Sequence, residues 1–264
     1  MSRHTDAPPD YTDVTELPGS GATREQCARL LNRYQTASRY ATSRQVLEIA
    51  CGAGLGLGYL ARSARRVIGG DFTSALLRQA QSHYLGRLPL VQLDAHALPF
   101  RSASFDLVLI LEALYYMRRP DRVLVETRRV LREHGTVLLC TVNKDWSGFG
   151  PSRLSTSYFS IPEIRDLLDE AGFDRPDFFG AFPTAAQTSL EKAVSLIRQA
   201  AVGLNLVPNT LGGRAMLKRF FYGRLTPLGP EVGDSMARVE PLRQLSNDSP
   251  TKDFKIVYAA ANVR

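Results

Sequence analysis

The fold is decided by one stretch of the sequence, Val46-Leu47-Glu48-Ile49-Ala50-Cys51-Gly52-Ala53-Gly54-Leu55-Gly56. A run of strand-forming residues ends abruptly in glycines at every second position. Because glycine has no Cβ atom and readily adopts positive φ, the main chain there can turn sharply and approach a ligand directly. The alternative is an ordinary turn between two elements.

The residues that follow alternate between short apolar runs and helical stretches. Apolar runs occupy 46–50, 67–70, 90–93, 105–111 and 136–142, and helical stretches occupy 57–63, 74–84 and 119–131. Such alternation is typical of βαβ units, which form a mostly parallel sheet with helices on both faces. Ligands of these sheets bind beyond the carboxyl ends of the strands, where the strand order reverses. We therefore expect the glycine loop to form the floor of a binding crevice.

The sequence around this core predicts further elements. Residues 1–22 are rich in Pro, Asp, Thr and Gly, which favours an irregular arm. Two capping boxes predict helix starts. The first is Thr23-Arg24-Glu25-Gln26, which begins a predicted helix that runs to about Tyr40. The second is Ser160-Ile161-Pro162-Glu163, which begins a predicted helix that runs to about Ala171.

Two more strands are expected over 178–182 and 254–260, separated by a long insertion with helical stretches near 190–204 and 210–222. An insertion of this length in a compact domain is usually functional. We predict a core domain over 23–183, a helical cap over 184–252 on the substrate side, and a last strand of the same sheet over 253–264.

Composition limits the classes of function. With 264 residues and 44% hydrophobic content, the chain can form one large globular domain. The net charge is +7, but basic and acidic residues are interspersed, so charge alone does not indicate a nucleic-acid partner. Cys27, Cys51 and Cys140 lie far apart without metal-ligand spacing, so we expect buried thiols and no metal site.

The sequence shows no segment that would place the chain in a membrane. No apolar run reaches the ~18–20 residues that span a bilayer. The first ten residues are polar and lack the apolar core of a signal peptide. We therefore expect a cytoplasmic protein without a membrane span.

Acidic residues end the next two predicted strands. Asp71 follows Gly54 by seventeen residues, where a carboxylate can accept both hydroxyls of a ribose. Asp94 and the N–H of Ala95 suit the exocyclic amine and a ring nitrogen of adenine. A nicotinamide or flavin dinucleotide would require Gly-x-Gly-x-x-Gly directly after the strand, which this loop does not match. Each acid alone would also fit as a helix cap or turn residue.

Six ordered motifs between residues 45 and 173 resemble the class I S-adenosylmethionine-dependent methyltransferases. The resemblance is closest to the small-molecule branch similar to the ubiquinone and menaquinone C-methyltransferases, with a methyltransferase type 11 domain. The motifs are Leu47–Gly56, Gly70–Thr73, Asp94–Phe100, Ser104–Val108, Arg129–Arg132 and Gly135–Leu139. The family implies an α/β fold with a Rossmann-like, seven-stranded, mostly parallel sheet and a C-terminal antiparallel strand. It also implies S-adenosylmethionine as cofactor and S-adenosylhomocysteine as product.

The resemblance assigns cofactor-binding roles to particular residues. It implies that Glu48 supports the loop and the cofactor's ammonium group, that Asp71 binds the ribose, and that Asp94 with Ala95 frames the adenine. The main chain of the glycine loop would approach the methionine portion. The expected cofactor-binding set is Glu48, Cys51, Gly52, Gly54, Gly56, Asp71, Phe72, Asp94, Ala95 and Glu112.

The methyl acceptor is expected over the ends of the fourth and fifth strands, where Glu112, Tyr116 and Asn143 are the candidate catalytic residues. Glu112 would contact the cofactor or take a proton; the alternative is a carboxylate favoured by a helix dipole. Tyr116 orients the acceptor or packs as an aromatic wall. Asn143 binds the acceptor or caps a turn. Family members often carry histidine after the fourth strand, whereas this chain has tyrosines.

We therefore expect an S-adenosylmethionine-dependent methyltransferase that acts on a small molecule, as a monomer or homodimer. Oxygen is the favoured acceptor atom, with nitrogen or carbon as alternatives, on a natural-product or sugar scaffold. Between Gln187 and Arg224 six bases face one acid, which would favour an anionic acceptor; the alternative is a solvated basic face.

Three rival functions are less well supported. A nucleic-acid methyltransferase would carry an Asp/Asn-Pro-Pro-aromatic motif after the fourth strand, where Leu111-Glu112-Ala113-Leu114 stands, so we expect no nucleic-acid partner. A cofactor-binding protein or non-methylating enzyme on the same fold is the main alternative, because fold does not establish reaction. A nicotinamide oxidoreductase is disfavoured by the glycine spacing.

Overall fold

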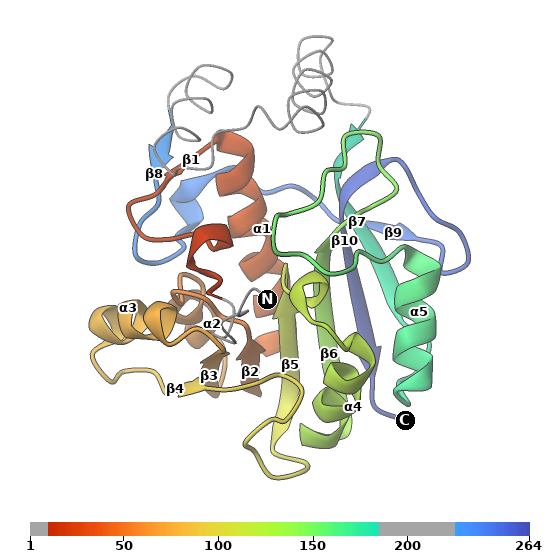
Figure 1. The fold of residues 1–264 in the computed structure, drawn as a ribbon, viewed down its shortest axis with the longest axis horizontal. Coiled ribbons are helices and arrows are strands. Elements are labelled where there is room, and N and C mark those ends of the chain that lie inside the picture. Colours follow the sequence, from red (N-terminus) through yellow and green to blue (C-terminus); the bar gives the residue numbers. More distant parts are fainter. Residues whose placement is uncertain (1–9, 185–224) are drawn as a thin grey trace, which may run out of the picture.

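The structure, a computed structural model, describes residues 10–184 and 225–264. Its centre is one twisted sheet (Figure 1). In spatial order the strands are β4 (Leu90–Gln92), β3 (Arg66–Asp71), β2 (Gln45–Ile49), β5 (Phe105–Leu111), β6 (Leu131–Val142), β10 (Phe254–Asn262), β7 (Asp177–Pro183) and β9 (Arg243–Leu245). The pairs among β4, β3, β2, β5 and β6 are parallel, whereas β10 runs antiparallel to both of its neighbours. The strand order reverses between β2 and β5.

The predicted fold class is confirmed, and within the described residues the sheet has eight strands where seven were expected. β9 is the strand that the sequence did not reveal, and it pairs antiparallel with β7 through Phe178–Leu245 and Gly180–Arg243. It lies inside the stretch predicted to be a helical cap. The described part of that stretch, residues 225–252, otherwise contains β8 (Thr226–Pro227) and the 3₁₀ turn η4 (Asp234–Met236). The helices expected over 190–204 and 210–222 lie outside the described residues.

Helices cover both faces of the sheet, as expected for βαβ units. One face carries α1 (Arg24–Ala41), α2 (Leu57–Ala61) and α3 (Ser74–Tyr84), and the other carries α4 (Pro120–Val130) and α5 (Ile161–Glu170). Successive strand residues point to opposite faces. Leu107 and Leu109 of β5 therefore join the first core cluster, and Val108 and Ile110 join the second. All four are fully buried, which explains the continuous apolar run of this strand.

Both predicted capping boxes stand at helix starts. Thr23 Oγ1 accepts a hydrogen bond from the N–H of Gln26 at 3.1 Å, and Gln26 Oε1 accepts from the N–H of Thr23 at 3.0 Å. Glu163 accepts from the N–H of Ser160 at 2.6 Å at the start of α5. These bonds satisfy N–H groups that lack partners inside the helix.

The N-terminal segment, residues 10–22, is more ordered than an irregular arm. It contains a 3₁₀ turn, η1 (Thr12–Val14), and a short strand, β1 (Gly21–Ala22), that pairs antiparallel with β8. The N–H of Gly19 also donates to the carbonyl of Leu228 at 2.8 Å. Within the described residues, no helix is long and apolar enough to cross a membrane.

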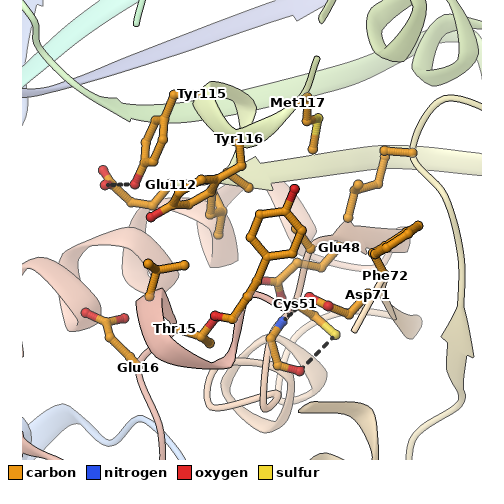
Figure 2. Close-up of a pocket in the computed structure, with 18 of the residues that line it drawn as sticks. Thr15, Glu16, Glu48, Cys51, Asp71, Phe72, Glu112, Tyr115, Tyr116 and Met117 are labelled. Atoms are coloured by element: carbon orange, nitrogen blue, oxygen red, sulfur yellow. Dashed lines mark hydrogen bonds between the residues drawn. The ribbon is translucent and has the colours of Figure 1, made fainter. Parts of the chain in front are cut away.

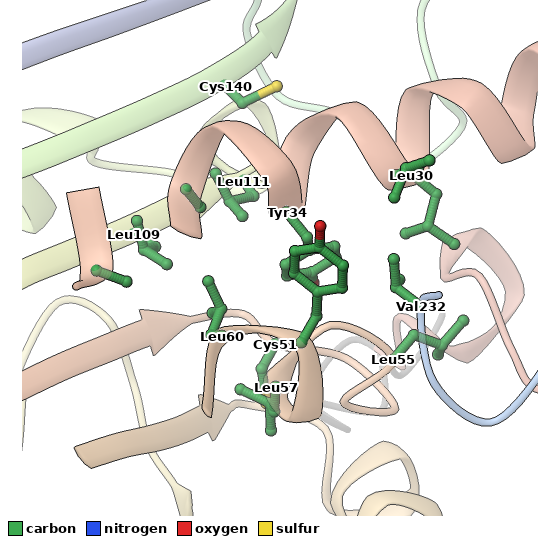
Figure 3. Close-up of a cluster of buried hydrophobic side chains, with 14 of the residues drawn as sticks. Leu30, Tyr34, Cys51, Leu55, Leu57, Leu60, Leu109, Leu111, Cys140 and Val232 are labelled. Carbon is green, nitrogen blue, oxygen red and sulfur yellow. The ribbon is translucent and has the colours of Figure 1, made fainter. Parts of the chain in front are cut away.

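The glycine loop is held by two tyrosines from different helices. The Tyr84 hydroxyl of α3 donates to the carbonyl of Gly54 at 2.7 Å and accepts from the N–H of Gly58 at 2.9 Å. The Tyr34 ring of α1 lies over Gly56, where a Cβ atom would come within 1.8 Å of a ring carbon. Figure 3 shows Tyr34 between Leu30 of its own helix and the loop residues. The loop therefore needs glycine at position 56 for helix packing.

We predict that Gly56→Ala destabilises the protein by about 1–3 kcal/mol, the range for inserting a methyl group into a packed core. The Tyr34 ring would have to move from its position over the loop. Urea denaturation of the wild type and variant measures the difference. Gly150→Ala is the matched control, because a Cβ atom at Gly150 meets nothing within 4 Å. Equal losses of stability in the two variants would contradict the role of this contact.

Candidate functional site

A cavity of about 750 Å³ lies at the carboxyl ends of β2, β3 and β5, next to the reversal of strand order. Its walls come from the glycine loop, from α1, from the residues after β4 and β5, and from the N-terminal segment. Figure 2 shows Glu48, Cys51 and Asp71 on one side of it and Glu112 and Tyr116 on another. This is where an open α/β sheet binds its ligands.

Asp71 connects the end of β3 to the glycine loop. One carboxylate oxygen accepts from the N–H of Gly52 and the other from the N–H of Thr73, both at 2.8 Å. Burial raises the pKa of Asp71, and these N–H groups act in the opposite direction. Each oxygen has accepting capacity left beyond its backbone bond. Asp71 therefore orients the loop and can still accept a hydroxyl group from a ligand.

Asp94 and Ala95 follow β4 and also line the cavity. Asp94 Oδ1 accepts from the N–H of His96 at 2.9 Å and lies 2.6 Å from His96 Nδ1. Burial works against ionisation of Asp94, but the hydrogen bonds from His96 outweigh it and lower the pKa below the ordinary value. Phe72, which lines the same end of the cavity, is 37% exposed and offers an apolar ring face.

Glu48 is a buried carboxylate with one oxygen left without a partner. Its Oε1 accepts from the Tyr34 hydroxyl at 2.7 Å, whereas Oε2 is buried and has no hydrogen bond. The residue is only 2% exposed and lines the cavity. Burial raises the pKa of Glu48 to about 7, although Tyr34 and the charge of Arg33 oppose the shift. A positively charged ligand group beside Oε2 would compensate this burial.

Glu112 stands directly after β5 in a left-handed conformation, with φ of 55°. Ala50, after β2, has φ of 60°, so both strands that flank the reversal end in a non-glycine residue with positive φ. Such backbone conformations are costly and cluster at functional sites. Glu112 Oε2 accepts from the Tyr115 hydroxyl at 3.0 Å, and burial raises the pKa of Glu112 despite the nearby charge of Arg33.

Tyr116 lines the cavity and packs against two other aromatic rings. Its hydroxyl donates to Ser152 Oγ at 2.9 Å, and its ring centroid lies 4.6 Å from that of Tyr115 and 5.6 Å from that of Tyr11. Burial raises the pKa of Tyr116 to about 12, so the hydroxyl stays protonated at neutral pH. Tyr116 therefore provides both an aromatic wall and a hydroxyl group.

Three of the residues predicted to act at the site lie away from the cavity lining. Gly54 and Gly56 are buried against the tyrosines of α3 and α1. Asn143 donates its two amide N–H groups to the carbonyls of Thr251 and Phe254, both at 2.7 Å, and joins the end of β6 to the start of β10. This placement favours the structural alternative for Asn143, and its role toward an acceptor stays a prediction.

The sequence did not point to several residues that the fold brings to the cavity. Tyr11, Val14, Thr15 and Glu16 come from the N-terminal segment, and Arg33 comes from α1. Arg33 forms an ion pair with Glu16, and its Nε atom is buried without a partner. Neither a motif nor a periodicity marks these positions, because only the folded topology places them near the glycine loop.

The residues of the cavity fit an adenosyl sulfonium that carries an amino-acid end. The carboxylates of Asp71 and Asp94 suit a ribose and an adenine amine, and the free oxygen of Glu48 suits an ammonium group. Gly52, with φ of 59°, presents bare main chain to the cavity. Carboxylate side chains outnumber arginines in the lining, which suits a positively charged ligand. The carboxylates are those of Glu16, Glu48, Asp71, Asp94 and Glu112, and the arginines are Arg33, Arg118 and Arg119.

An open, mostly parallel sheet with a buried carboxylate beside the reversal of strand order is the architecture of Rossmann-like nucleotide-binding proteins. Comparison with known proteins narrows this class. Residues 47–139 match the family model described as a methyltransferase domain. The similar proteins include ones named as S-adenosylmethionine-dependent methyltransferases, and the chain shares their methyltransferase domain over this range. The ubiquinone-like branch stays a prediction.

Two curated relatives and one solved structure illustrate the similarity. The chain is 31% identical over 164 residues to a probable S-adenosylmethionine-dependent methyltransferase of Mycolicibacterium smegmatis, covering 60% of this chain and 63% of that one. It is 32% identical to a malonyl-[acyl-carrier protein] O-methyltransferase of Laribacter hongkongensis, over 58% of each chain. A possible histamine N-methyltransferase from Thermotoga maritima shares the fold, with a TM-score of 0.59, 15% identity and coverage of 90% and 92%.

The chain spans between about half and 63% of the length of the first curated relatives.

We predict that the stability of Glu48→Gln relative to wild type increases with pH. The folded-state pKa of about 7 exceeds the ordinary 4.5, so the folded protein holds the proton more tightly. The resulting stabilisation is present below pH 4.5 and is lost as the pH rises through 7. Urea denaturation at pH 5 and pH 8 should show a change of up to about 3 kcal/mol in the difference between the two proteins.

The exposed residue Glu133 provides the matched control, because its side chain is 86% exposed. Glu133→Gln measures the effect of removing one surface carboxylate. A difference between Glu48→Gln and wild type that is the same at both pH values would contradict the shifted pKa.

Proposed function

We propose that this protein transfers a methyl group from S-adenosylmethionine to the oxygen atom of a small-molecule acceptor. The observation that carries the proposal is the position of Gly52, Asp71 and Asp94. They follow three neighbouring parallel strands and line one cavity, which continues past Glu112 to Tyr116. The adenosyl part would lie at Asp71 and Asp94, and the acceptor would lie on the Glu112 side.

The sulfonium supplies an electrophilic methyl group and leaves as the neutral thioether S-adenosylhomocysteine. The task of the chain is then to align the acceptor with the methyl group and to exclude water. Residues suited to this task are the aromatic rings of Tyr11, Tyr115 and Tyr116, which stand side by side at one wall. Gly52 and Asp71 hold the opposite wall in a fixed geometry.

Glu112 is the candidate proton acceptor if the acceptor group is a hydroxyl. Its carboxylate lies at the end of β5, lines the cavity and has a pKa raised by burial. A raised pKa brings a carboxylate closer to the value that a general base needs near neutral pH. An ionised carboxylic acid as acceptor would need no base, because its oxygen already carries the attacking electron pair.

The name of one relative and the net charge of one segment support a particular class of acceptor. One relative is named as an O-methyltransferase of a malonyl-carrier protein, which supports oxygen as the acceptor atom. The excess of basic residues between 187 and 224 supports an anionic acceptor, although those residues lie outside the described part of the chain. A fatty acid or another carboxylic acid has both a negative charge and an oxygen atom that can accept the methyl group. Natural-product and sugar acceptors remain alternatives.

Other expectations from the sequence stay part of the proposal. We propose a cytoplasmic location, a monomer or homodimer, and a substrate-side unit formed from residues 184–252 above a core that starts at residue 23. The positions of β8 and η4 beside the N-terminal segment and α2 support a separate unit there, whereas β9 belongs to the main sheet.

The test of the proposed function has two parts. Calorimetry should first detect binding of S-adenosylmethionine and S-adenosylhomocysteine. Incubation with methyl-labelled cofactor and a panel of fatty acids, acyl thioesters, phenols and sugars should then yield a labelled, base-labile ester or a stable ether. Binding without transfer to any member of the panel would favour the cofactor-binding alternative. Absence of binding would remove the proposal.

We predict that Glu112→Gln lowers the turnover number with a hydroxyl acceptor about 100-fold, the usual contribution of a general base. Turnover with a carboxylate acceptor should change much less. Calorimetry with S-adenosylhomocysteine shows whether the loss lies in cofactor binding instead. A loss of cofactor affinity as large as the loss of turnover would assign Glu112 to the cofactor.

A further inference from the structure

Glu112 is held by a residue of the neighbouring strand that no motif indicated. We propose that Cys140 is a positioning residue for Glu112, because its buried thiol donates a hydrogen bond that keeps the carboxylate in place and ionised. The inference rests on the proposed function, in which Glu112 takes the proton of a hydroxyl acceptor, and adds a residue to it.

Cys140 holds Glu112 through both its backbone and its side chain. β5 and β6 are parallel neighbours, and Leu111 pairs with Cys140 in their register. Directly after this pair, the N–H of Glu112 donates to the carbonyl of Cys140 at 2.7 Å. The Cys140 thiol then donates to Glu112 Oε1 at 3.6 Å. Two bonds from one residue therefore fix Glu112 relative to β6, at a point where its own backbone has the unusual φ of 55°.

The two oxygens of the Glu112 carboxylate have different donors. Oε2 accepts from the Tyr115 hydroxyl at 3.0 Å, and Oε1 accepts from Cys140. Tyr115 belongs to the wall of the cavity, whereas Cys140 does not line it. The thiol therefore acts on Glu112 from outside the cavity, and its removal leaves the surfaces for cofactor and acceptor in place.

The surroundings of Cys140 keep its thiol protonated. Cys140 is 1% exposed, within the apolar cluster that includes residues of α1 (Figure 3). Burial, followed by the negative charge of Glu112, raises the pKa of the thiol well above its ordinary value. The thiol is therefore a hydrogen-bond donor at neutral pH, since only the protonated form carries the hydrogen.

The residue opposite Cys140 uses its own hydrogen elsewhere. Tyr258 of β10 pairs with Cys140 in the sheet register, so the two side chains stand on the same face. The Tyr258 hydroxyl donates to Asn32 Oδ1 at 2.7 Å, and Asn32 Nδ2 donates to the carbonyl of Glu240 at 2.6 Å. Charged acceptors form stronger hydrogen bonds than neutral ones, which favours Glu112 over the Tyr258 oxygen as the acceptor of the thiol hydrogen.

Charged groups from other elements also act on Glu112. Burial raises its pKa, the charges of Arg33 and Arg29 on α1 and the hydroxyl of Tyr115 oppose the shift, and Glu16 of the N-terminal segment adds to it. A hydrogen bond to the ionised form of a carboxylate lowers its pKa. Loss of the thiol should therefore raise the pKa of Glu112 while these other groups stay as they are.

The first test measures the titration of Glu112 without relying on turnover. In protein labelled with carbon-13 at the glutamate carboxyl carbons, the resonance that is missing from Glu112→Gln belongs to Glu112. Cys140→Ala should move the midpoint of its titration upward by about 0.5 to 1 pH unit, as expected for loss of one hydrogen bond. Cys140→Ser, which keeps a donor, should move it less. Cys140→Val, which keeps the bulk without a donor, serves if Cys140→Ala does not fold.

Cys27→Ala is the matched control, because Cys27 is 2% exposed, belongs to the same apolar cluster and does not line the cavity. It removes one buried sulfur atom without removing a donor to Glu112. Its midpoint should equal that of wild type. An unchanged midpoint in Cys140→Ala, or an equal shift in Cys27→Ala, would overturn the inference.

Turnover as a function of pH then tests whether the contact serves the reaction. With a hydroxyl acceptor, turnover of Cys140→Ala should fall at a higher pH than that of wild type, because Glu112 must be ionised to take a proton. The KM of the acceptor should stay at the wild-type value. A shifted midpoint with an unshifted turnover profile would overturn the positioning role. If the wild type transfers no methyl group to any acceptor, the proposed function itself fails, whereas the carbon-13 titration still decides whether the thiol acts on Glu112.

Discussion

The hydrogen bond from Tyr34 to Glu48 is the contact on which the rest of the site depends. It joins the first long helix to the first strand of the parallel sheet, and both residues are buried. The same tyrosine ring covers Gly56 and belongs to the same buried apolar cluster as Leu55 and Leu57. The path of the glycine loop, the position of Glu48 and the direction of α1 are therefore fixed together. A change in any one of them would move the others.

The side chains and backbone of the site lower the free energy of unfolding of the protein. Glu48 and Asp71 are carboxylates that are almost fully buried, and burial raises the pKa of both. Ala50 and Glu112 hold backbone conformations that L-residues rarely adopt. The two apolar clusters on either side of the sheet offset this cost, because strands such as β5 are buried on both faces. The ligand would in turn stabilise the charged side chains of the cavity.

The sequence predicted those parts of the fold that depend on local pattern. The range of β5 and α3 agreed to the residue, because an unbroken apolar run and a helical period leave little choice of boundary. β9 could not be found in this way, since it has two exposed residues and one half-buried residue and joins the sheet through pairing with a distant strand. The same limit applies to the site. Asp71 and Asp94 follow predicted strands, whereas the approach of Tyr11 and Arg33 to the cavity depends on tertiary structure alone.

Asparagine at position 143 shows a further limit of sequence reasoning. An amide after a strand can bind a substrate or satisfy backbone carbonyls, and both functions use the same atoms. The structure gives these donors to residues 251 and 254, which no pattern near Asn143 could have indicated. Likewise, alternating glycines suggested close approach to a ligand, yet Gly54 and Gly56 are already required by the packing of tyrosines.

The pairing of β1 with β8 has a consequence for the newly synthesised chain. The segment that carries Tyr11 and Glu16 is tied to the protein body by bonds from Gly19 and Ser20 to Leu228. A ribosome must therefore synthesise the chain through Leu228 before this wall of the cavity can be fastened. Contacts between residues so distant along the chain form late in folding. The parallel strands β2 to β6 all precede residue 143, so the nascent protein can form this part of its scaffold before the N-terminal wall of the cavity is fastened.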